Sequence, residues 1–285
     1  MNWIFKLCTI ALAQCWFVNA HAIPVLMSGD VFDDMQTFLA GRQPEDIERF
    51  FGPGMRRDVA EAIILVQAAR LGGYSDPIDL ISDQNTPEHR TKQITAQSDV
   101  VALAQPVWET LDPEFADDLT ISAPLLDEGE FIVGIYVNEN HPYTQAKPTL
   151  EEVKSLTFTV SATWRRDIDV IEHVGWPHST TVNWVAMLEM LAQNKADAIL
   201  APFQPGDEMA LVTPNLTLRP VLGYTVSFKG SRHFAISKHH PESEGFKSAL
   251  DAGLIQLKAE GRLRQIYVEA GFFNDSIFEW TNLVQ

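Results

Sequence analysis

The sequence has few of the residues that build reactive or cross-linked sites. Its 285 residues include two cysteines, Cys8 and Cys15, and both lie in an apolar stretch at the N-terminus. If that stretch is removed, a disulfide, a thiol nucleophile and a thiolate metal site are all excluded from the remaining chain. The sequence also lacks a G-x-S-x-G nucleophile turn and a glycine-rich phosphate loop. We therefore expect a protein that is not an enzyme, with no catalytic residues.

Basic residues are also scarce. The chain has 21 Lys and Arg against 38 Asp and Glu, which gives a formal net charge of −17. Such a surface repels phosphates, so no nucleic acid is expected as a partner. The acidic excess is interpreted as a solubilising surface.

The N-terminus has the order of a secretory signal peptide. Lys6 precedes the apolar run Leu7–Val18, and Ala20–Ala22 provides the small residues of a cleavage site. The run is short for a membrane anchor, which needs about 20 apolar residues. A lipoprotein acylated on Cys15 is a further alternative, but Gln14 fits poorly beside the cleaved bond. We predict a signal peptide over residues 1–22, cleavage after Ala22 and a periplasmic location.

The remaining chain alternates strand and helix patterns, which is typical of an α/β protein with parallel strands. Short apolar runs bounded by polar residues predict the strands, and apolar residues at helical spacing predict the helices. The predicted strands cover 23–26, 78–81, 98–103, 131–137, 156–160 and 195–200. The predicted helices cover 57–71, a segment from Thr86 with Pro87 in its first turn, 150–154, and a segment that begins at 179–181 and continues over 185–192.

The C-terminal quarter is the most informative stretch. Phe234–Ile236 predicts a strand, Pro241 begins a helix, Gly261 interrupts it, and a second helix ends before Gly271. This order resembles the end of the bacterial extracellular solute-binding proteins of family 3. The matching residues are Gly230, Arg232, Lys238, Pro241, Phe246, Leu250, Leu257, Gly261, Leu263, Ile266 and Tyr267.

The resemblance extends over nearly the whole chain after the leader. Residues 149–163 are similar to the opening of the family's second lobe, and Lys195–Leu200 is similar to its "GraDai" strand, with Asn194 and Lys195 in place of glycine and arginine. The family implies a two-lobe, type II periplasmic-binding-protein fold with two hinge crossovers. We place lobe 1 at 23–137 plus 226–285 and lobe 2 at 138–225. The implied function is capture of a small solute for a membrane permease of an ABC transporter, by a monomer without a cofactor.

Such a fold places the solute at loops and helix starts that follow strands. The candidate ligand-binding residues by this criterion are Asp30, Gln105, Trp108, Ser161, Thr163, Trp164, Arg165 and Thr180. Each also has an ordinary structural interpretation. The hydroxyl groups could cap helices, the tryptophans could be core residues, and Arg165 and Arg166 could pair with Asp167, Asp169 or Glu172.

Two contacts that the resemblance implies for amino-acid ligands are missing. The family's arginine for the α-carboxylate aligns near Leu111, and no Arg occurs between Arg90 and Arg165. The acidic residue for the α-ammonium aligns with 201–205, which contains none, and Asp207 comes later. An ordinary free α-amino acid is therefore not the expected ligand.

Other functions are weighed against this one. The histidines, including His239 and His240, lack the spacing of a metal site, so no metal is expected. The same module could instead serve a membrane sensor as its ligand-binding partner. An enzyme on this scaffold would need a lone acid such as Asp30 or Glu109, which no other motif supports.

Overall fold

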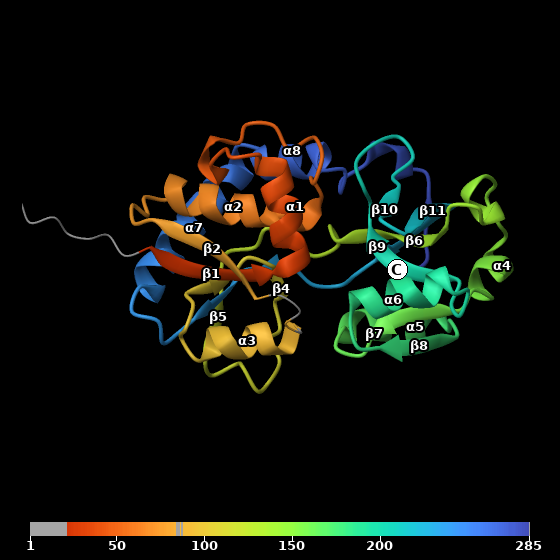
Figure 1. Cartoon of the computed structure of the whole chain (residues 1–285), viewed down its shortest axis with the longest axis horizontal. Helices are drawn as coiled ribbons and strands as arrows, with labels where there is room; N and C mark the ends of the chain where they lie inside the picture. Colours follow the sequence, from red (N-terminus) through yellow and green to blue (C-terminus); the bar gives the residue numbers. More distant parts are fainter. Residues whose placement is uncertain (1–21, 84–85, 87, 285) are drawn as a thin grey trace, which may run out of the picture.

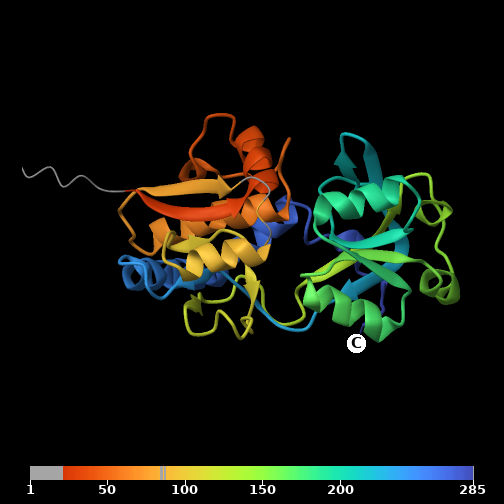
Figure 2. The ribbon, with the colours of Figure 1, turned by 60° about the horizontal axis from the view of Figure 1, so that its bottom comes forward.

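The chain forms two lobes, each built around its own β-sheet (Figures 1 and 2). The computed structural model describes residues 22–83, 86 and 88–284. The predicted signal peptide lies outside the described residues, apart from Ala22. No helix in the described part of the chain is both long and apolar enough to cross a membrane.

The first sheet has the strand order β2-β1-β3-β13-β5. β1 runs parallel to β2 and β3, whereas β13 is antiparallel to β3 and β5. The apolar side chains on both faces of β1 are buried, as expected for a strand that is covered on both sides. The strands are β1 (Ile23–Ser28), β2 (Ile78–Asp83), β3 (Ala102–Leu103), β5 (Leu119–Ile121) and β13 (Ala235–Ser237).

Helices from both ends of the chain cover this sheet. They are α1 (Gly29–Leu39), α2 (Arg57–Leu71), α3 (Glu88–Ala96), α7 (Ser243–Ala259) and α8 (Arg262–Glu269), with a short 3-10 turn at Pro44–Asp46. α2 is buried along most of its length, and α7 packs against it. The two backbones approach so closely that a Cβ atom at Gly253 would lie 1.8 Å from the carbonyl oxygen of Ala68. This contact fixes the C-terminal helices to the first lobe.

The second sheet has the order β10-β11-β6-β9-β7-β8, and β14 pairs with β11. Its strands are β6 (Ile132–Asn138), β7 (Phe158–Ser161), β8 (His178–Thr181), β9 (Ala198–Pro202), β10 (Leu211–Thr213), β11 (Leu216–Ser227) and β14 (Thr281–Asn282). Its helices are α4 (Leu150–Lys154), α5 (Arg165–Val174) and α6 (Trp184–Ala192). β4 (Val107–Trp108) and β12 (Arg232–His233) form a separate two-stranded ladder, and 3-10 turns span Pro142–Thr144 and Asp275–Ile277.

The chain passes between the sheets at residues 127–131, before β6, and at 228–231, after β11. It passes a third time after α8, because β14 joins the second sheet. The lobe limits drawn from the sequence, 137/138 and 225/226, fall at the end of β6 and inside β11, both of which belong to the second sheet. We propose that the lobes meet instead at 127–131 and 228–231.

Most of the predicted elements are present, and three local predictions need correction or comment. The strand predicted over 98–103 is limited to Ala102–Leu103, and Ser98 has a left-handed φ of 64°. The helix predicted to begin at 179–181 is wrong there, because these residues form β8, where β-branched threonines fit well. The helix begins at Trp184, after Asn183 caps it by accepting the N–H of Ala186 (3.0 Å). The Pro87 helix start lies outside the described residues.

Candidate functional site

Two of the predicted site residues, Asp30 and Gln105, lie near the end of β1. Ser28 ends the strand, and its Oγ accepts a hydrogen bond from Nε2 of Gln105 at 2.6 Å. Asp30 lies in the first turn of α1, where its carboxylate accepts a hydrogen bond from Nη2 of Arg56 at 2.7 Å. Asp30 and Gln105 are therefore near the same strand end, and each is already paired within the first lobe.

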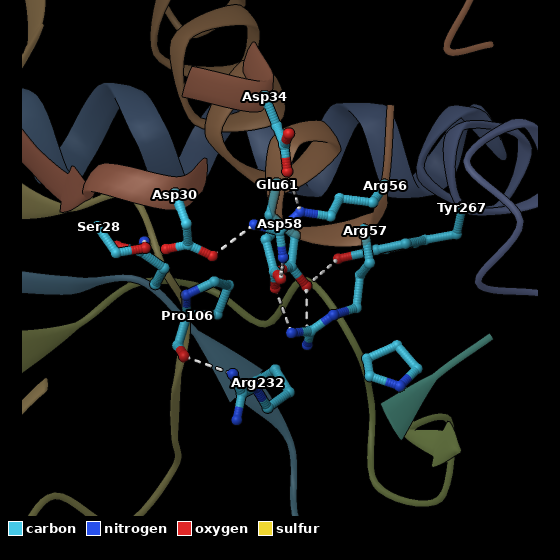
Figure 3. Close-up of polar contacts among 12 residues, drawn as sticks. Ser28, Asp30, Asp34, Arg56, Arg57, Asp58, Glu61, Pro106, Arg232 and Tyr267 are labelled. Atoms are coloured by element: carbon cyan, nitrogen blue, oxygen red, sulfur yellow. Dashed lines mark hydrogen bonds and ion pairs between the residues drawn. The ribbon is translucent and has the colours of Figure 1, made fainter. Parts of the chain in front are cut away.

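Trp108, at the end of β4, lies where two of the interlobe passages meet. Its ring stacks on Phe228 (centroids 5.7 Å apart) and meets Phe131 edge-on (5.3 Å). The guanidinium of Arg232 lies 4.6 Å from the Trp108 centroid and also donates a hydrogen bond to the carbonyl of Pro106 (Figure 3). These contacts fix the orientation of the indole. Trp108 therefore has a structural role in packing, whether or not it also binds a ligand.

Glu109 follows Trp108, and the 228–231 passage holds its carboxylate. Oε2 accepts a hydrogen bond from the backbone N–H of Ser231 at 2.8 Å. Gly230 has a φ of 101°, and a Cβ atom there would lie 2.2 Å from Glu109 Oε2. Glycine at this position thus makes the approach of the carboxylate sterically feasible.

The second lobe contributes the turn between β7 and α5. Ser161 is buried and lies 3.0 Å, hydroxyl to hydroxyl, from the exposed Thr163. Trp164 precedes α5 and stacks on Trp184 with ring centroids 6.2 Å apart. Arg165 is exposed at the first position of the helix. Four predicted residues therefore share one turn, in the lobe opposite to Asp30, Gln105 and Trp108.

Thr180 lies apart from that turn. It is exposed in β8, with Val160 of β7 as its partner in the parallel ladder. β8 lies at one edge of the second sheet. Its predicted place at a helix start is wrong, and its predicted role in ligand binding stays a prediction.

Arg166, next to the predicted Arg165, joins the two lobes. Its Nη2 lies 3.1 Å from Oε1 of Glu109, and its guanidinium lies 5.5 Å from the Trp108 centroid. Nη1 also lies 3.5 Å from the carbonyl of Lys229. The sequence left open a pairing of this arginine with acids of its own helix. In the structure Arg166 forms an ion pair with Glu109, which lies 57 residues earlier in the chain.

A second group of charges lies inside the first lobe, at the start of α2. We call Arg57, Asp58, Glu61 and Tyr267 the buried charge group (Figure 3). The guanidinium of Arg57 contacts the Asp58 carboxylate and lies 3.6 Å from Glu61 Oε1, to which the hydroxyl of Tyr267 donates at 3.3 Å. Arg57 also lies 4.9 Å from the ring centroid of Phe131. The group thus contacts the same interlobe passage as Trp108.

Burial determines the electrostatics of this group. It raises the pKa of Glu61 to about 7, even though Arg57 opposes the shift. Burial has the same tendency at Asp58, but Arg57 and Arg56 outweigh it and hold the Asp58 pKa below its ordinary value. Burial, followed by the charge of Glu61, raises the pKa of Tyr267.

The sequence reasoning did not find the buried charge group or the partner of Arg166. One signal was available for the first: Arg57 and Glu61 are four residues apart at the start of a helix that continues with the apolar run 62–66, so they share a face. No local pattern links Arg166 to Glu109. Among the described residues, no group of three His, Cys, Asp or Glu side chains has the geometry to hold a metal ion.

No family model and no curated protein matches the sequence. Solved structures of the same fold are found at low sequence identity. The periplasmic VFT2 domain of Bordetella pertussis BvgS has a TM-score of 0.55 and 10% identity, over 90% of this chain and 96% of that domain. An amino acid ABC transporter substrate-binding protein from Streptococcus pneumoniae, bound to L-arginine, has a TM-score of 0.54 and 15% identity, over 89% and 95%. Substrate-binding domain 2 of Lactococcus lactis GlnP, in an open conformation, has a TM-score of 0.51 and 10% identity, over 89% and 96%.

Proposed function

We propose that the chain binds a small solute between its lobes. The proposal starts from its two-lobe, type II periplasmic-binding-protein fold, which confirms the fold expected from the sequence. Closure of the lobes around the solute would favour one of two lobe arrangements and so signal occupancy. The protein would act as a binding protein and not as an enzyme.

The contact of Arg166 with Trp108 and Glu109 carries this proposal. It identifies the surfaces of the two lobes that approach each other, because Arg166 lies in the first turn of α5 and Glu109 follows β4. Both surfaces lie beside strand ends, where loops and helix starts offer polar groups to a ligand. A solute held there would contact both lobes, which is the requirement for closure.

We propose that residues from both surfaces contact the solute. Those of the first lobe are Asp30, Gln105 and Trp108, and those of the second are Ser161, Thr163, Trp164 and Arg165, with Thr180 as a more remote candidate. Several of these polar groups are now paired within the protein, as Asp30 is with Arg56. A ligand would therefore exchange existing hydrogen bonds for new ones, and its affinity would depend on how completely it replaces them.

The partner of the closed form would be a membrane permease of an ABC transporter or, as an alternative, a membrane sensor. We further propose that residues 1–22 direct the protein to the periplasm. The substrate-binding protein from Streptococcus pneumoniae is bound to L-arginine in its solved structure. In this chain the residues aligned with the family's amino-acid contacts, Leu111 and 201–205, argue for a different solute class.

A thermal-shift screen of residues 23–285 tests the proposal. The panel contains amino acids, carboxylates, polyamines, sugars and aromatic acids, and each hit is followed by small-angle X-ray scattering. A solute present at about 100 times its Kd should stabilise the folded protein by about 2.7 kcal/mol. Binding between the lobes should also reduce the radius of gyration.

Two variants locate the site. Trp108→Ala should weaken binding of the hit, whereas Val212→Ser should not, because Val212 is exposed on β10 (72%). A hit that binds both variants equally and leaves the scattering unchanged would place the solute elsewhere and contradict the proposed interlobe site.

A further inference from the structure

We propose that Trp108 and Glu109 form a subsite for the cationic group of the solute, and that Arg166 of the opposite lobe occupies this subsite when no solute is bound. The inference rests on the proposed function, since it assigns a chemical class to a solute bound between the lobes. It also gives Arg166 the role of an internal competitor.

The carboxylate half of the subsite is held by the first lobe itself. Glu109 Oε2 accepts a hydrogen bond from the N–H of Ser231. It also lies so close to Gly230 that a side chain at position 230 would collide with it. The other oxygen, Oε1, accepts a hydrogen bond from the guanidinium of Arg166. If Arg166 moves away, Oε1 remains in place as an acceptor for another cation.

The aromatic half is equally fixed. Phe228 stacks on Trp108, and Phe131 packs against its ring. Indole is the best of the aromatic side chains at attracting a cation over its face. The Arg166 guanidinium, 5.5 Å from the ring centroid and hydrogen-bonded to Glu109, demonstrates that this pair of groups accepts a planar cation.

Arg166 is the part that can leave. Arg166 belongs to the second lobe, in the first turn of α5, and its side chain is 32% exposed. A cation is not stabilised by the helix dipole at that end. Glu109 is 35% exposed, so the pair is partly hydrated and costs little to separate.

Arg232 makes the carboxylate indispensable. Its guanidinium also lies against Trp108, at 4.6 Å, and its hydrogen bond to the Pro106 carbonyl keeps it in the wall of the subsite. This positive charge repels a second cation near the ring. The ring alone therefore would not retain a cationic solute, and Glu109 must supply the compensating charge.

Isothermal titration calorimetry at low ionic strength tests the inference with three probes. Butylguanidinium carries the cation, butylurea has the same shape without the charge, and succinate carries the opposite charge. The proteins are the wild type, Arg166→Ala, Glu109→Gln and the double variant. The matched control is Arg219→Ala, because Arg219 is also 32% exposed and pairs with Glu208 within the second lobe.

Arg166→Ala should bind butylguanidinium roughly fivefold more tightly than the wild type does, because the internal competitor is gone. Glu109→Gln and the double variant should bind butylguanidinium at least about tenfold more weakly than Arg166→Ala does. Arg219→Ala should match the wild type, and butylurea should bind weakly to every protein. Circular dichroism confirms that each variant is folded.

Either of two results of the calorimetry would overturn the inference. One is that Arg166→Ala binds butylguanidinium no better than the wild type does. The other is that succinate binds the wild type and loses affinity in Arg166→Ala, which would make Arg166 a ligand for anions. If an uncharged or anionic solute from the thermal-shift panel compacts the protein, the proposed function stands and only the cation subsite fails. If no solute binds, both fail.

Discussion

The buried charge group and the Arg166–Glu109 pair use the same three chemical parts in different surroundings. Each joins a guanidinium to a carboxylate beside an aromatic ring, Phe131 for Arg57 and Trp108 for Arg166. In the first lobe Glu61 is fully buried, whereas between the lobes Glu109 and Arg166 are about one-third exposed. The difference in exposure therefore distinguishes the Arg57–Glu61 contact, which must persist, from the Arg166–Glu109 contact, which can be exchanged.

The two regions are also neighbours. Phe131 contacts Arg57 on one side and Trp108 on the other, and it lies in the 127–131 passage between the lobes. A buried ion pair is costly to break because the remaining charge stays without water. A partly exposed pair loses little, because water replaces the partner. The buried charge group can thus hold the N-terminal end of α2 beside the 127–131 passage while the exposed pair changes partners.

Removing Arg57 should have the largest effect. Arg57→Ala leaves Asp58 and the buried Glu61 without their main counter-charge, and we expect the free energy of unfolding to fall by about 3–5 kcal/mol. Urea denaturation at pH 7 measures it. Arg49→Ala is the control, since Arg49 is 81% exposed and its pair with Glu269 should contribute less than about 1 kcal/mol. Similar losses in the two variants would erase the distinction between the regions.

Glu61 should give the next largest effect, as a dependence of stability on pH. Its pKa is about 7 in the folded protein and near 4.5 when exposed. Between these values the folded protein holds a proton that the unfolded chain releases, so stability falls as pH rises from about 4.5 to 7. The total fall from this group is roughly 3 kcal/mol.

The difference between the wild type and Glu61→Gln isolates this contribution. Contributions from groups other than Glu61 are common to both proteins and largely cancel if they are independent of Glu61. Urea denaturation at several pH values should show a steeper fall in the wild type over this window. Equal slopes would mean that Glu61 is ionised in the folded protein at pH 5.

The fold follows from the sequence because it depends on local patterns and on their order. The 57–71 helix has the predicted limits, and Gly261 and Gly271 lie where the C-terminal helices break and end. Pro241, predicted to begin the first of them, lies two residues before it, since α7 begins at Ser243 after the cap residue Glu242. Residues 179–181 show where the reasoning failed. Hydroxyl residues suit both a helix start and an edge strand, and the pairing of β8 with β7, a tertiary contact, decided between them.

The candidate site was less accessible to sequence reasoning. Trp108 and the turn before α5 do lie at strand ends, as the sequence indicated, and their role in ligand binding stays a prediction. The partner of Arg166 could not be derived, because 57 residues and a change of lobe separate it from Glu109. A nearby acid on the same helix was the simpler choice from sequence spacing alone.

Tyr267→Phe should produce a smaller loss than either change in α2. It removes a hydroxyl that donates to Glu61 at 3.3 Å but leaves the ring packed against Phe272 and Phe273. We expect a loss of about 1 kcal/mol at pH 8, where Glu61 is mostly ionised and accepts the bond. At pH 5 the loss should be smaller. A loss as large as that of Arg57→Ala would show that the hydroxyl, and not the guanidinium, compensates Glu61.

The Arg166–Glu109 pair should contribute least to stability, and its contribution should respond to salt. A double-mutant cycle with Arg166→Ala and Glu109→Gln should give a coupling of less than about 1 kcal/mol in low salt, from urea denaturation of the four proteins. Raising the ionic strength to about 1 M, where the Debye length is about 3 Å, should remove most of it. The loss caused by Arg57→Ala should change little under the same conditions, because salt does not reach the buried Glu61. A coupling above about 2 kcal/mol that persists in high salt would mean that the lobes are joined by a fixed contact, and Arg166 could not then yield its place to a solute.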